Sequence, residues 1–207
     1  FNILHTGAAQ VGGLDLGFVP AKGGKATGDM LGSMDVLFLL GADELDMSKV
    51  KGTVVYIGSH GDAGAHRADV ILPAATYTEK SGTWVNTEGR VQMGNRANFA
   101  PGDAKEEWAI LRALSAQMGD ALPFDSLSQL RSQLYSEFPH FAALDEVATG
   151  DIGDVKALAK GKSGKVLKSG FASPIKDFYL TNPIARASKV MAECSQLASG
   201  TVRQAAE

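Results

Sequence analysis

The sequence predicts an α/β fold: a layer of parallel strands, then helices, then an extended C-terminal arm and a final helix. Two continuous apolar runs of strand length, residues 34–40 and 53–57, each lead into a glycine, and a third short run ends at Pro73. Strands of parallel sheets are covered on both faces, so they form unbroken rather than alternating apolar runs. We therefore expect the first two runs to be buried strands of one parallel layer.

Composition narrows the classes of function. With 207 residues, 44% hydrophobic and 21% charged, the chain is large enough for one sizeable core. Its net charge of -3 gives no electrostatic reason to expect a nucleic-acid partner. No apolar run approaches the roughly 20 residues that a membrane-spanning helix needs, so we expect no direct membrane insertion. The single cysteine, Cys194, cannot form an internal disulfide, which is typical of a reducing compartment.

Three segments follow one another in the predicted organisation. An α/β domain occupies residues 1–149, a lysine- and glycine-rich arm residues 150–176, and a helical segment residues 177–207. The chain begins at Phe1, without Met or a signal-like segment, and residues 3–4 already look like part of a strand. We therefore expect a piece cut from something larger.

The connections around the predicted sheet are short. Only about a dozen residues join the first two strands, near the minimum for a crossover, so any helix between them must be short. After Pro73, a hairpin is predicted around Asn86 and Gly89, with Gly89 at positive φ. Charged side chains flank it, and we expect them to pin the turn through ion pairs and backbone hydrogen bonds: Glu79, Glu88 and Arg90.

Helical periodicity begins after residue 102. Three helices are predicted, and we interpret all three as packing elements. The first starts at a capping box of Asp103 and Glu106 and stops at Gly119. The second spans residues 126–138, with Ser126 and Gln129 as its capping box. The third is shorter and follows Pro139, with Phe141, Leu144 and Val147 on one side.

The arm at residues 150–176 has too few apolar side chains to build a core. It carries lysines at positions 156, 160, 162, 165 and 168. Two interpretations stay open: a solvated linker, which is the simpler one, or an arm that lies along an acidic neighbouring surface. The final helix is predicted to begin at Pro183 with Asn182 as its cap. Its apolar stripe includes Cys194, which we interpret as a small buried hydrophobic residue rather than a nucleophile or ligand.

Two local patterns suggest chemistry only weakly. Gly58, Gly61 and Gly64 follow a strand, so their amides could cradle a phosphate. About ten residues separate that strand from the next, too few for the full helix of a dinucleotide fold, and a plain tight turn is the simpler interpretation. His60 and Asp62 lie near a second histidine, His66, but a fourth metal ligand is missing. For His5 and His140 no partner is evident, and no serine or cysteine has the context of a nucleophile.

Four stretches carry a resemblance to known families. Residues 68–92, ADVILPAATYTEKSGTWVNTEGRVQ, resemble a late segment of the molybdopterin oxidoreductases, typified by formate dehydrogenases. Residues 4–20, 40–45 and 177–194, the last reading DFYLTNPIARASKVMAEC, are similar to the large iron–sulfur subunits of respiratory complex I. The terminal motif is absent from molybdenum enzymes and favours the complex I family. Essentially the whole chain fits the C-terminal portion of such a subunit.

The resemblance implies a molybdopterin-oxidoreductase-like domain that works as a non-catalytic scaffold in the peripheral arm of NADH:quinone oxidoreductase. In that family the 2Fe-2S and 4Fe-4S clusters are held upstream of the region matched here, and this chain is expected to hold neither cofactor nor metal. The partners implied are other peripheral-arm subunits, on the cytoplasmic side of a bacterial membrane or the matrix side of the mitochondrial inner membrane. Where molybdenum enzymes have a threonine-rich turn, this chain has SHGDAGAHR at residues 59–67.

Two other functions stay open at this point. In a guanine-dinucleotide-binding domain of a molybdopterin-dependent oxidoreductase, the residues at the carboxyl ends of the strands would face the dinucleotide: Gly41, Asp43, Gly58, His60 and Asp62. The other is a free-standing soluble α/β module that binds some other nucleotide.

Overall fold

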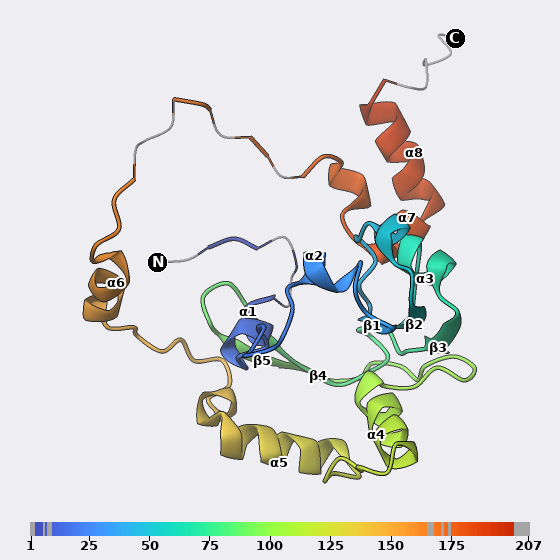
Figure 1. Ribbon diagram of the computed structural model, residues 1–207, viewed down its shortest axis with the longest axis horizontal. Helices are drawn as coiled ribbons and strands as arrows, with labels where there is room; N and C mark the ends of the chain where they lie inside the picture. Colours follow the sequence, from blue (N-terminus) through green and yellow to red (C-terminus); the bar gives the residue numbers. More distant parts are fainter. Residues whose placement is uncertain are drawn as a thin grey trace. The chain divides into compact units, whose positions relative to one another are not determined.

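The computed structural model describes residues 3–5, 7, 10–164, 168–170, 172–173 and 175–200 (Figure 1). The chain divides into two compact units, each assembled from separate stretches of sequence. One unit takes residues 1–19, 82–94 and 131–174, and the other takes residues 20–81, 95–130 and 175–207. We call them the hairpin unit and the sheet unit. The segment limits predicted at residues 149 and 176 stay predictions.

The sheet unit is built on a parallel sheet, as predicted. Its strands are β1 (Val36–Leu40), β2 (Thr53–Gly58) and β3 (Val70–Pro73), in the order β1-β2-β3. Both neighbouring pairs are parallel, with Leu39 opposite Tyr56 and Ile57 opposite Leu72. β2 is the central strand, and its Val54 and Ile57 side chains are fully buried.

β1 is not buried on both faces, so that prediction is wrong. Leu37 and Leu39 are buried, but the alternate side chains Val36, Phe38 and Leu40 are 47%, 40% and 52% exposed. β1 lies at the edge of the sheet, and within the described residues only one of its faces is covered. An unbroken apolar run therefore overestimates burial for an edge strand.

Short elements cover that face, as the short connections predict. The chain passes through α2 (Thr27–Met30) before β1, the 3-10 turn η1 (Met47–Lys49) after it, and α3 (Ala63–Arg67) after β2. Side chains from these connections pack with the sheet in one cluster: Leu31, Leu37, Leu39, Met47, Val50, Val54 and Tyr56, lined by Ala65 and Ala68.

The helix α4 (Glu107–Gln117) begins later than its predicted capping box. Glu106, expected at the third position of the helix, is instead the extended residue that precedes it. Its carboxylate accepts a hydrogen bond from Trp108 Nε1 at 2.8 Å, so the glutamate is used by a ring rather than by backbone. The predicted stop at Gly119 is confirmed, because Gly119 has a φ of 83°.

The hairpin unit contains the predicted hairpin, formed by β4 (Gly82–Val85) and β5 (Val91–Gly94). Gly89 has a φ of 83°, as expected. Asn86 organises the turn, since its side-chain oxygen accepts from the amides of Glu88 and Arg90 at 2.9 and 3.0 Å. Arg90 pairs with Glu88 at 3.5 Å, which confirms their pinning role.

Glu79 has a different role from the one predicted. Its carboxylate accepts from the Thr76 amide at 3.0 Å, so it closes the turn at residues 76–79 rather than the hairpin. The three charged residues are close in sequence, but Glu79 lies in the sheet unit and the hairpin does not.

The remaining core of the hairpin unit gathers around Val85, Val91 and Phe141, which are all buried. It receives α1 (Gln10–Asp15), the 3-10 turn η2 (Pro139–Ala142) and the C-terminal part of α5 (Leu127–Glu137), whose first residues belong to the sheet unit. The side chains packed against the buried three are Val11, Leu134, Tyr135, Phe138 and Leu144.

Two helix predictions in this region need correction. The capping box of α5 is half formed: Ser126 Oγ accepts from the Gln129 amide at 3.2 Å, but Gln129 Oε1 accepts from the Asp125 amide, not from that of Ser126. The helix predicted after Pro139 is only a 3-10 turn that ends at Ala142, because Ala143 already leaves helical geometry with a ψ of 72°. Val147, placed on its apolar side, is 43% exposed.

The arm is not extended throughout. Residues Ile152–Ala159 form the helix α6, capped by Asp151, whose side chain accepts from the Gly153 amide at 2.7 Å. The cap and the helix-favouring run VKALA explain the local structure without any core. Every side chain of α6 is exposed, so this helix has no core of its own. Lys165 lies outside the described residues.

The final segment comprises the 3-10 turn η3 (Phe178–Leu180), α7 (Pro183–Ala187) and α8 (Lys189–Ala198). The predicted cap is confirmed, with Asn182 Oδ1 accepting from the Ala185 amide at 2.9 Å. The prediction of one continuous helix is wrong, because Ser188 is extended and caps α8 instead. The predicted stripe is consequently broken: Val190 is 65% exposed and Cys194 is half-buried.

Two findings concern the chain's relation to membranes and its start. None of the helices in the described part of the chain is long and apolar enough to cross a bilayer. Residues 3–5 form no strand, contrary to the expectation for residues 3–4.

Candidate functional site

The predicted site residues lie together at the carboxyl ends of the strands in the sheet unit. Gly41 directly follows β1, with a φ of 62°, and Asp43 comes two residues later. Gly58 is the last residue of β2, and His60 and Asp62 lie in the connection to α3. This edge is where parallel α/β sheets place their ligands. We call it the carboxyl edge.

Asp43 is the buried centre of this edge. It is 3% exposed, and its Oδ1 accepts a hydrogen bond from the Gly64 amide at 2.6 Å. A Cβ at position 64 would lie 2.9 Å from both the Ala42 carbonyl oxygen and Asp43 Oδ1. Glycine is therefore required at position 64 so that the backbone can approach the carboxylate.

Asp62 accepts a hydrogen bond from the amide that precedes Gly64, that of Ala63. The accepting atom is Oδ1, and this bond caps α3. Of the three glycines whose amides were candidates to cradle a phosphate, Gly64 already donates to Asp43, and the neighbouring Ala63 amide donates to Asp62.

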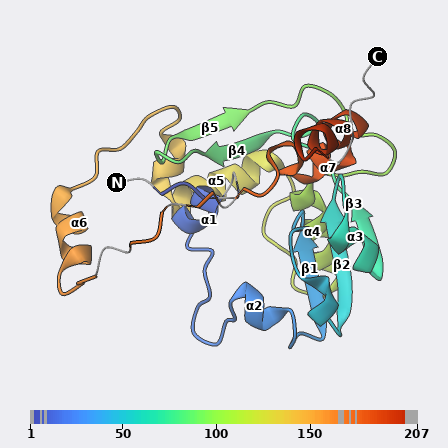
Figure 2. The same ribbon diagram turned by 90° about the horizontal axis from the view of Figure 1, so that it is seen from above.

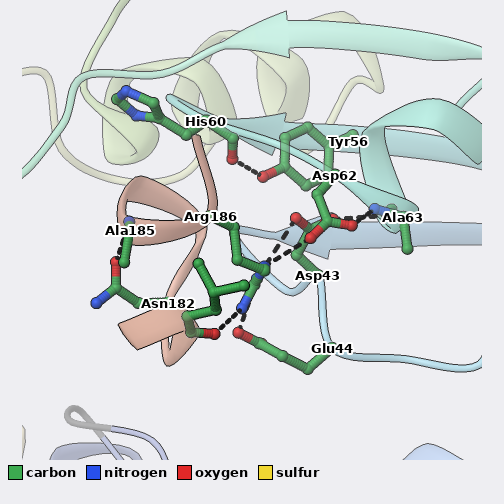
Figure 3. Close-up of polar contacts among 11 residues, drawn as sticks. Asp43, Glu44, Tyr56, His60, Asp62, Ala63, Asn182, Ala185 and Arg186 are labelled. Atoms are coloured by element: carbon green, nitrogen blue, oxygen red, sulfur yellow. Dashed lines mark hydrogen bonds and ion pairs between the residues drawn. The ribbon is translucent and has the colours of Figure 1, made fainter. Parts of the chain in front are cut away.

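Arg186 of α7 completes the edge (Figure 3). Its Nε donates to Asp62 Oδ2 at 2.6 Å and its Nη2 donates to Glu44 Oε1 at 2.9 Å. Nη2 also lies 3.7 Å from Asp43 Oδ2, the buried carboxylate oxygen that no hydrogen bond from the described residues satisfies. One guanidinium therefore joins three carboxylates that come from two loops.

Burial and charge act in opposite directions on this arginine. Desolvation lowers the pKa of Arg186. Hydrogen bonds and charge interactions with Glu44 and Asp62 raise it by more, so the net shift of the pKa is upward. The guanidinium thus stays charged at any working pH. Tyr56 shares the environment: burial, and then the charges of Asp43 and Glu44, raise the pKa of its phenol.

Sequence reasoning missed Arg186 as a site residue. It pairs with residues 124 and 142 positions away, a separation at which sequence spacing carries no information. A usable signal existed within the motif at residues 177–194. Arg186 is the only charged side chain of α7, next to the capping Asn182, and a lone cation in a short apolar helix needs an anionic partner if it is buried.

The histidines do not assemble a metal site. His60 Nδ1 lies 3.1 Å from Ser59 Oγ, and its backbone carbonyl accepts from the Tyr56 hydroxyl. His66 is exposed on α3, and Asp62 is occupied by Arg186. Among the residues that the structure describes, no group of three or more His, Cys, Asp or Glu side chains could hold a metal ion.

His140 does have partners, which the sequence did not reveal. Its Nε2 lies 3.9 Å from Asp15 Oδ2, and its ring packs on Phe141 with centroids 4.6 Å apart. It is a packing residue of the hairpin unit.

The carboxyl edge does not fit a nucleotide phosphate in this conformation. A Cβ on Gly58 would meet the Tyr56 ring at 2.7–2.8 Å, and one on Gly61 would meet Ala65 Cβ at 2.3 Å, so these glycines serve tight packing against the chain itself. Three carboxylates face one guanidinium, which leaves the edge net negative. Phosphate sites need free amides and net positive charge, whereas here the Ala63 and Gly64 amides already donate to carboxylates and the one guanidinium is outnumbered by carboxylates.

A concavity of about 320 Å³ in the sheet unit lies between residues 96–109 and Glu79. Among its lining residues, Glu106 accepts from Trp108 Nε1 and lies 3.9 Å from Arg96, whose guanidinium stacks 4.4 Å from the Phe99 ring centroid. Nothing in it resembles a set of convergent catalytic groups.

Comparison with known proteins gives two family matches. The family model described as Molybdopterin oxidoreductase matches residues 1–117. A second model, for the C-terminal region of the G subunit of NADH-ubiquinone oxidoreductase, matches residues 146–194. The second match includes α7 and Arg186.

Curated relatives agree with these matches. The chain is 42% identical over 200 residues to the NADH-ubiquinone oxidoreductase 75 kDa subunit of Reclinomonas americana, covering 95% of this chain and 28% of the relative. It is 41% identical over 198 residues to the mitochondrial NADH dehydrogenase [ubiquinone] iron-sulfur protein 1 of Solanum tuberosum (95% and 26%). The mitochondrial NADH-ubiquinone oxidoreductase 78 kDa subunit of Candida albicans is 40% identical over 200 residues (93% and 27%). The chain thus spans about a quarter of these relatives' length, and the resemblance predicted from the motifs is confirmed.

Proposed function

Because this chain belongs to the molybdopterin oxidoreductase family and matches complex I subunits over nearly its whole length, we propose that it is a non-catalytic scaffold part of the NADH:quinone oxidoreductase peripheral arm. The observation that carries the proposal is the coverage: 93–95% of this chain, including both units, aligns with relatives named as complex I subunits. In its full length the subunit would relay electrons from NADH through iron–sulfur clusters towards quinone.

The clusters belong, on this proposal, to the part of the subunit that the chain does not span. An iron–sulfur cluster of the 2Fe-2S or 4Fe-4S type takes about four ligands, mostly cysteine thiolates. This chain has one cysteine, the half-buried Cys194 of α8. The chain would therefore hold the surrounding structure in place without carrying electrons itself.

The partners would be other peripheral-arm subunits, on the bacterial cytoplasmic or mitochondrial matrix side of the membrane. The arm is a candidate contact, because α6 exposes Ile152 (66%) and Leu158 (75%) beside Lys156 and has no core of its own. We expect the amides of residues 152–164 to exchange more slowly in the assembled complex than in the free chain. Equal exchange in both would contradict docking of the arm.

The competing function is dinucleotide binding at the carboxyl edge, as in a molybdopterin-dependent oxidoreductase such as a formate dehydrogenase. The occupied amides and net negative charge argue against it. Molybdenum and pterin analysis of the intact subunit should find neither, and a stoichiometric amount of either would overturn the proposal. Titration of the 207-residue chain with guanosine and adenosine nucleotides should show no binding tighter than about 1 mM.

A scaffold role predicts that damage to this chain lowers the amount of assembled complex but not the NADH:quinone turnover of each complex. Phe141 is 3% exposed in the core of the hairpin unit, and a Phe→Ala change at such a site costs about 3–5 kcal/mol. Phe141→Ala should lower the amount of assembled complex on native gels, because a destabilised chain is degraded more often. NADH:quinone turnover per assembled complex should stay unchanged. A parallel fall in turnover would place the segment in the electron-transfer machinery.

A further inference from the structure

The C-terminal segment, residues 175–200, makes hydrogen bonds and packing contacts within itself as well as with the loops of the sheet. Asp177 caps η3 through the Tyr179 amide at 2.9 Å, and its other carboxylate oxygen accepts from the Ser195 hydroxyl of α8. Asn182 and Ser188 cap α7 and α8. The three short elements contact one another, and Figure 2 shows α7 and α8 beside the ends of the strands.

From this module one long side chain reaches the carboxyl edge. Arg186 is held on its own side by the Leu180 carbonyl, which accepts from Nη1 at 3.4 Å. The rest of its fork is directed at Asp62 and Glu44, as Figure 3 shows. Its own side chain is only 18% exposed, whereas the Asp62 and Glu44 side chains that it reaches are 40% and 60% exposed. An anchor fixed in advance loses little side-chain entropy on docking, which strengthens the contact.

The edge is chemically matched to this anchor. Asp43 is fully buried, and its Oδ2 lacks a hydrogen bond from the described residues, with the guanidinium 3.7 Å away as the nearest compensation. A buried carboxylate is costly without a counter-charge. A planar guanidinium can serve several carboxylates at once, whereas a phosphate would add negative charge to three carboxylates.

We propose that residues 175–200 are an intramolecular strap, and that the carboxyl edge is the docking site for its Arg186, in the position where related folds receive a nucleotide phosphate. The strap lies within the sheet unit, so it does not depend on which complex the chain joins. Docking ties the end of the chain to the β1 and β2 loops. It also supplies the positive counter-charge that the buried Asp43 carboxylate needs.

Amide hydrogen exchange on the 207-residue chain tests the strap. In Arg186→Gln, we expect exchange to rise about tenfold or more in residues 183–198 and 59–66, since two charge-assisted hydrogen bonds are lost. The strands at 36–40 and 53–58 should keep their protection. If residues 183–198 exchange as in the wild type, Arg186 is not the anchor and the strap is wrong.

A matched control separates anchoring from the general loss of an arginine. Arg112 of α4 also forks between a carboxylate, Asp125 at 2.7 Å, and a carbonyl, Phe124 at 2.9 Å, with 24% of its side chain exposed. Arg112→Gln should leave exchange in residues 183–198 unchanged. A rise there equal to that in Arg186→Gln would refute a specific anchor.

If Arg186→Gln unfolds the whole sheet unit, two milder measurements decide. Arg186→Lys keeps the charge but loses the fork, and should raise exchange in 183–198 by less while the strands stay protected. Raising NaCl from about 0.1 M to about 1 M shortens the screening length from about 10 Å to about 3 Å and should speed exchange in the wild-type strap. If amide exchange in residues 183–198 changes neither in Arg186→Lys nor at high salt, the proposal is wrong.

Discussion

A double-mutant cycle on Asp43 and Arg186 tests whether the buried carboxylate depends on the arginine. The two changes are Asp43→Asn and Arg186→Gln. Asn keeps an oxygen that can accept from the Gly64 amide, which lies 2.6 Å from Asp43 Oδ1, but removes the charge. We expect Asp43→Asn to cost about 1–2 kcal/mol of unfolding free energy, because a charge-assisted hydrogen bond becomes a neutral one.

Arg186→Gln should cost more. A buried pair that loses one partner costs about 3–5 kcal/mol, since an uncompensated charge stays behind. Only Asp43 is fully buried; the Asp62 and Glu44 side chains are 40% and 60% exposed, so water screens them. With that discount we expect about 2–4 kcal/mol.

The two costs should not add. In the double variant no buried charge is left without a counter-ion, so its cost should fall below the sum by about 1 kcal/mol or more. The control cycle pairs Asp43→Asn with Arg112→Gln, whose partner Asp125 is 78% exposed and belongs to another cluster. That pair should be additive within about 0.5 kcal/mol.

Urea unfolding measures all four corners of each cycle. Trp108 of α4 reports on the sheet unit, so its fluorescence is followed in a Trp84→Phe background, which removes the reporter of the hairpin unit. Additive costs for Asp43→Asn and Arg186→Gln would refute the reasoning, because they would mean that the 3.7 Å approach carries no energetic coupling.

Three further outcomes are expected. Gly89→Val should lower the melting temperature by the equivalent of about 1 kcal/mol or more, because φ at position 89 is 83°. Gly89→Asn should lower it by less, since asparagine tolerates that region better. Equal melting temperatures for both variants and the wild type would contradict this cost. Gly64→Ala should lower the free energy of unfolding in urea by about 1–3 kcal/mol, because its Cβ would lie 2.9 Å from Asp43 Oδ1. The control Gly13→Ala, whose Cβ would meet only open space in the described residues, should be neutral or stabilising. A larger loss for Gly13→Ala than for Gly64→Ala would argue against the close approach. The Val54 amide, and then Arg67, lower the pKa of Asp69, so its contribution is present above the unfolded-state pKa of about 3.9 and is lost as the pH falls through the folded-state pKa. Urea midpoints measured from about pH 7 to about pH 3 should therefore fall less steeply in Asp69→Asn than in the wild type, and identical slopes would exclude this role.

The elements that could be predicted are those whose cause is local. Gly89 and Asn86 specify the hairpin turn through φ and an Asx hydrogen bond, and Asn182 caps α7 through the amide three residues on. The parallel sheet was also predictable, because apolar runs separated by short connections leave few alternatives. Local signals failed where an alternative partner competed, as for Glu106, whose carboxylate binds the Trp108 ring nitrogen instead of capping a helix.

The site divides along the same line. Chain order alone locates Gly41, Asp43, Gly58, His60 and Asp62 at one edge, because the carboxyl ends of parallel strands meet there. Only the folded chain decides what that edge does: Arg186, more than 120 residues away in sequence, lies between Asp62 and Glu44 and above the buried Asp43. Hydrogen bonds and ion pairs act over a few ångströms in space and are indifferent to separation along the chain, so residue spacing does not specify which carboxylates Arg186 contacts.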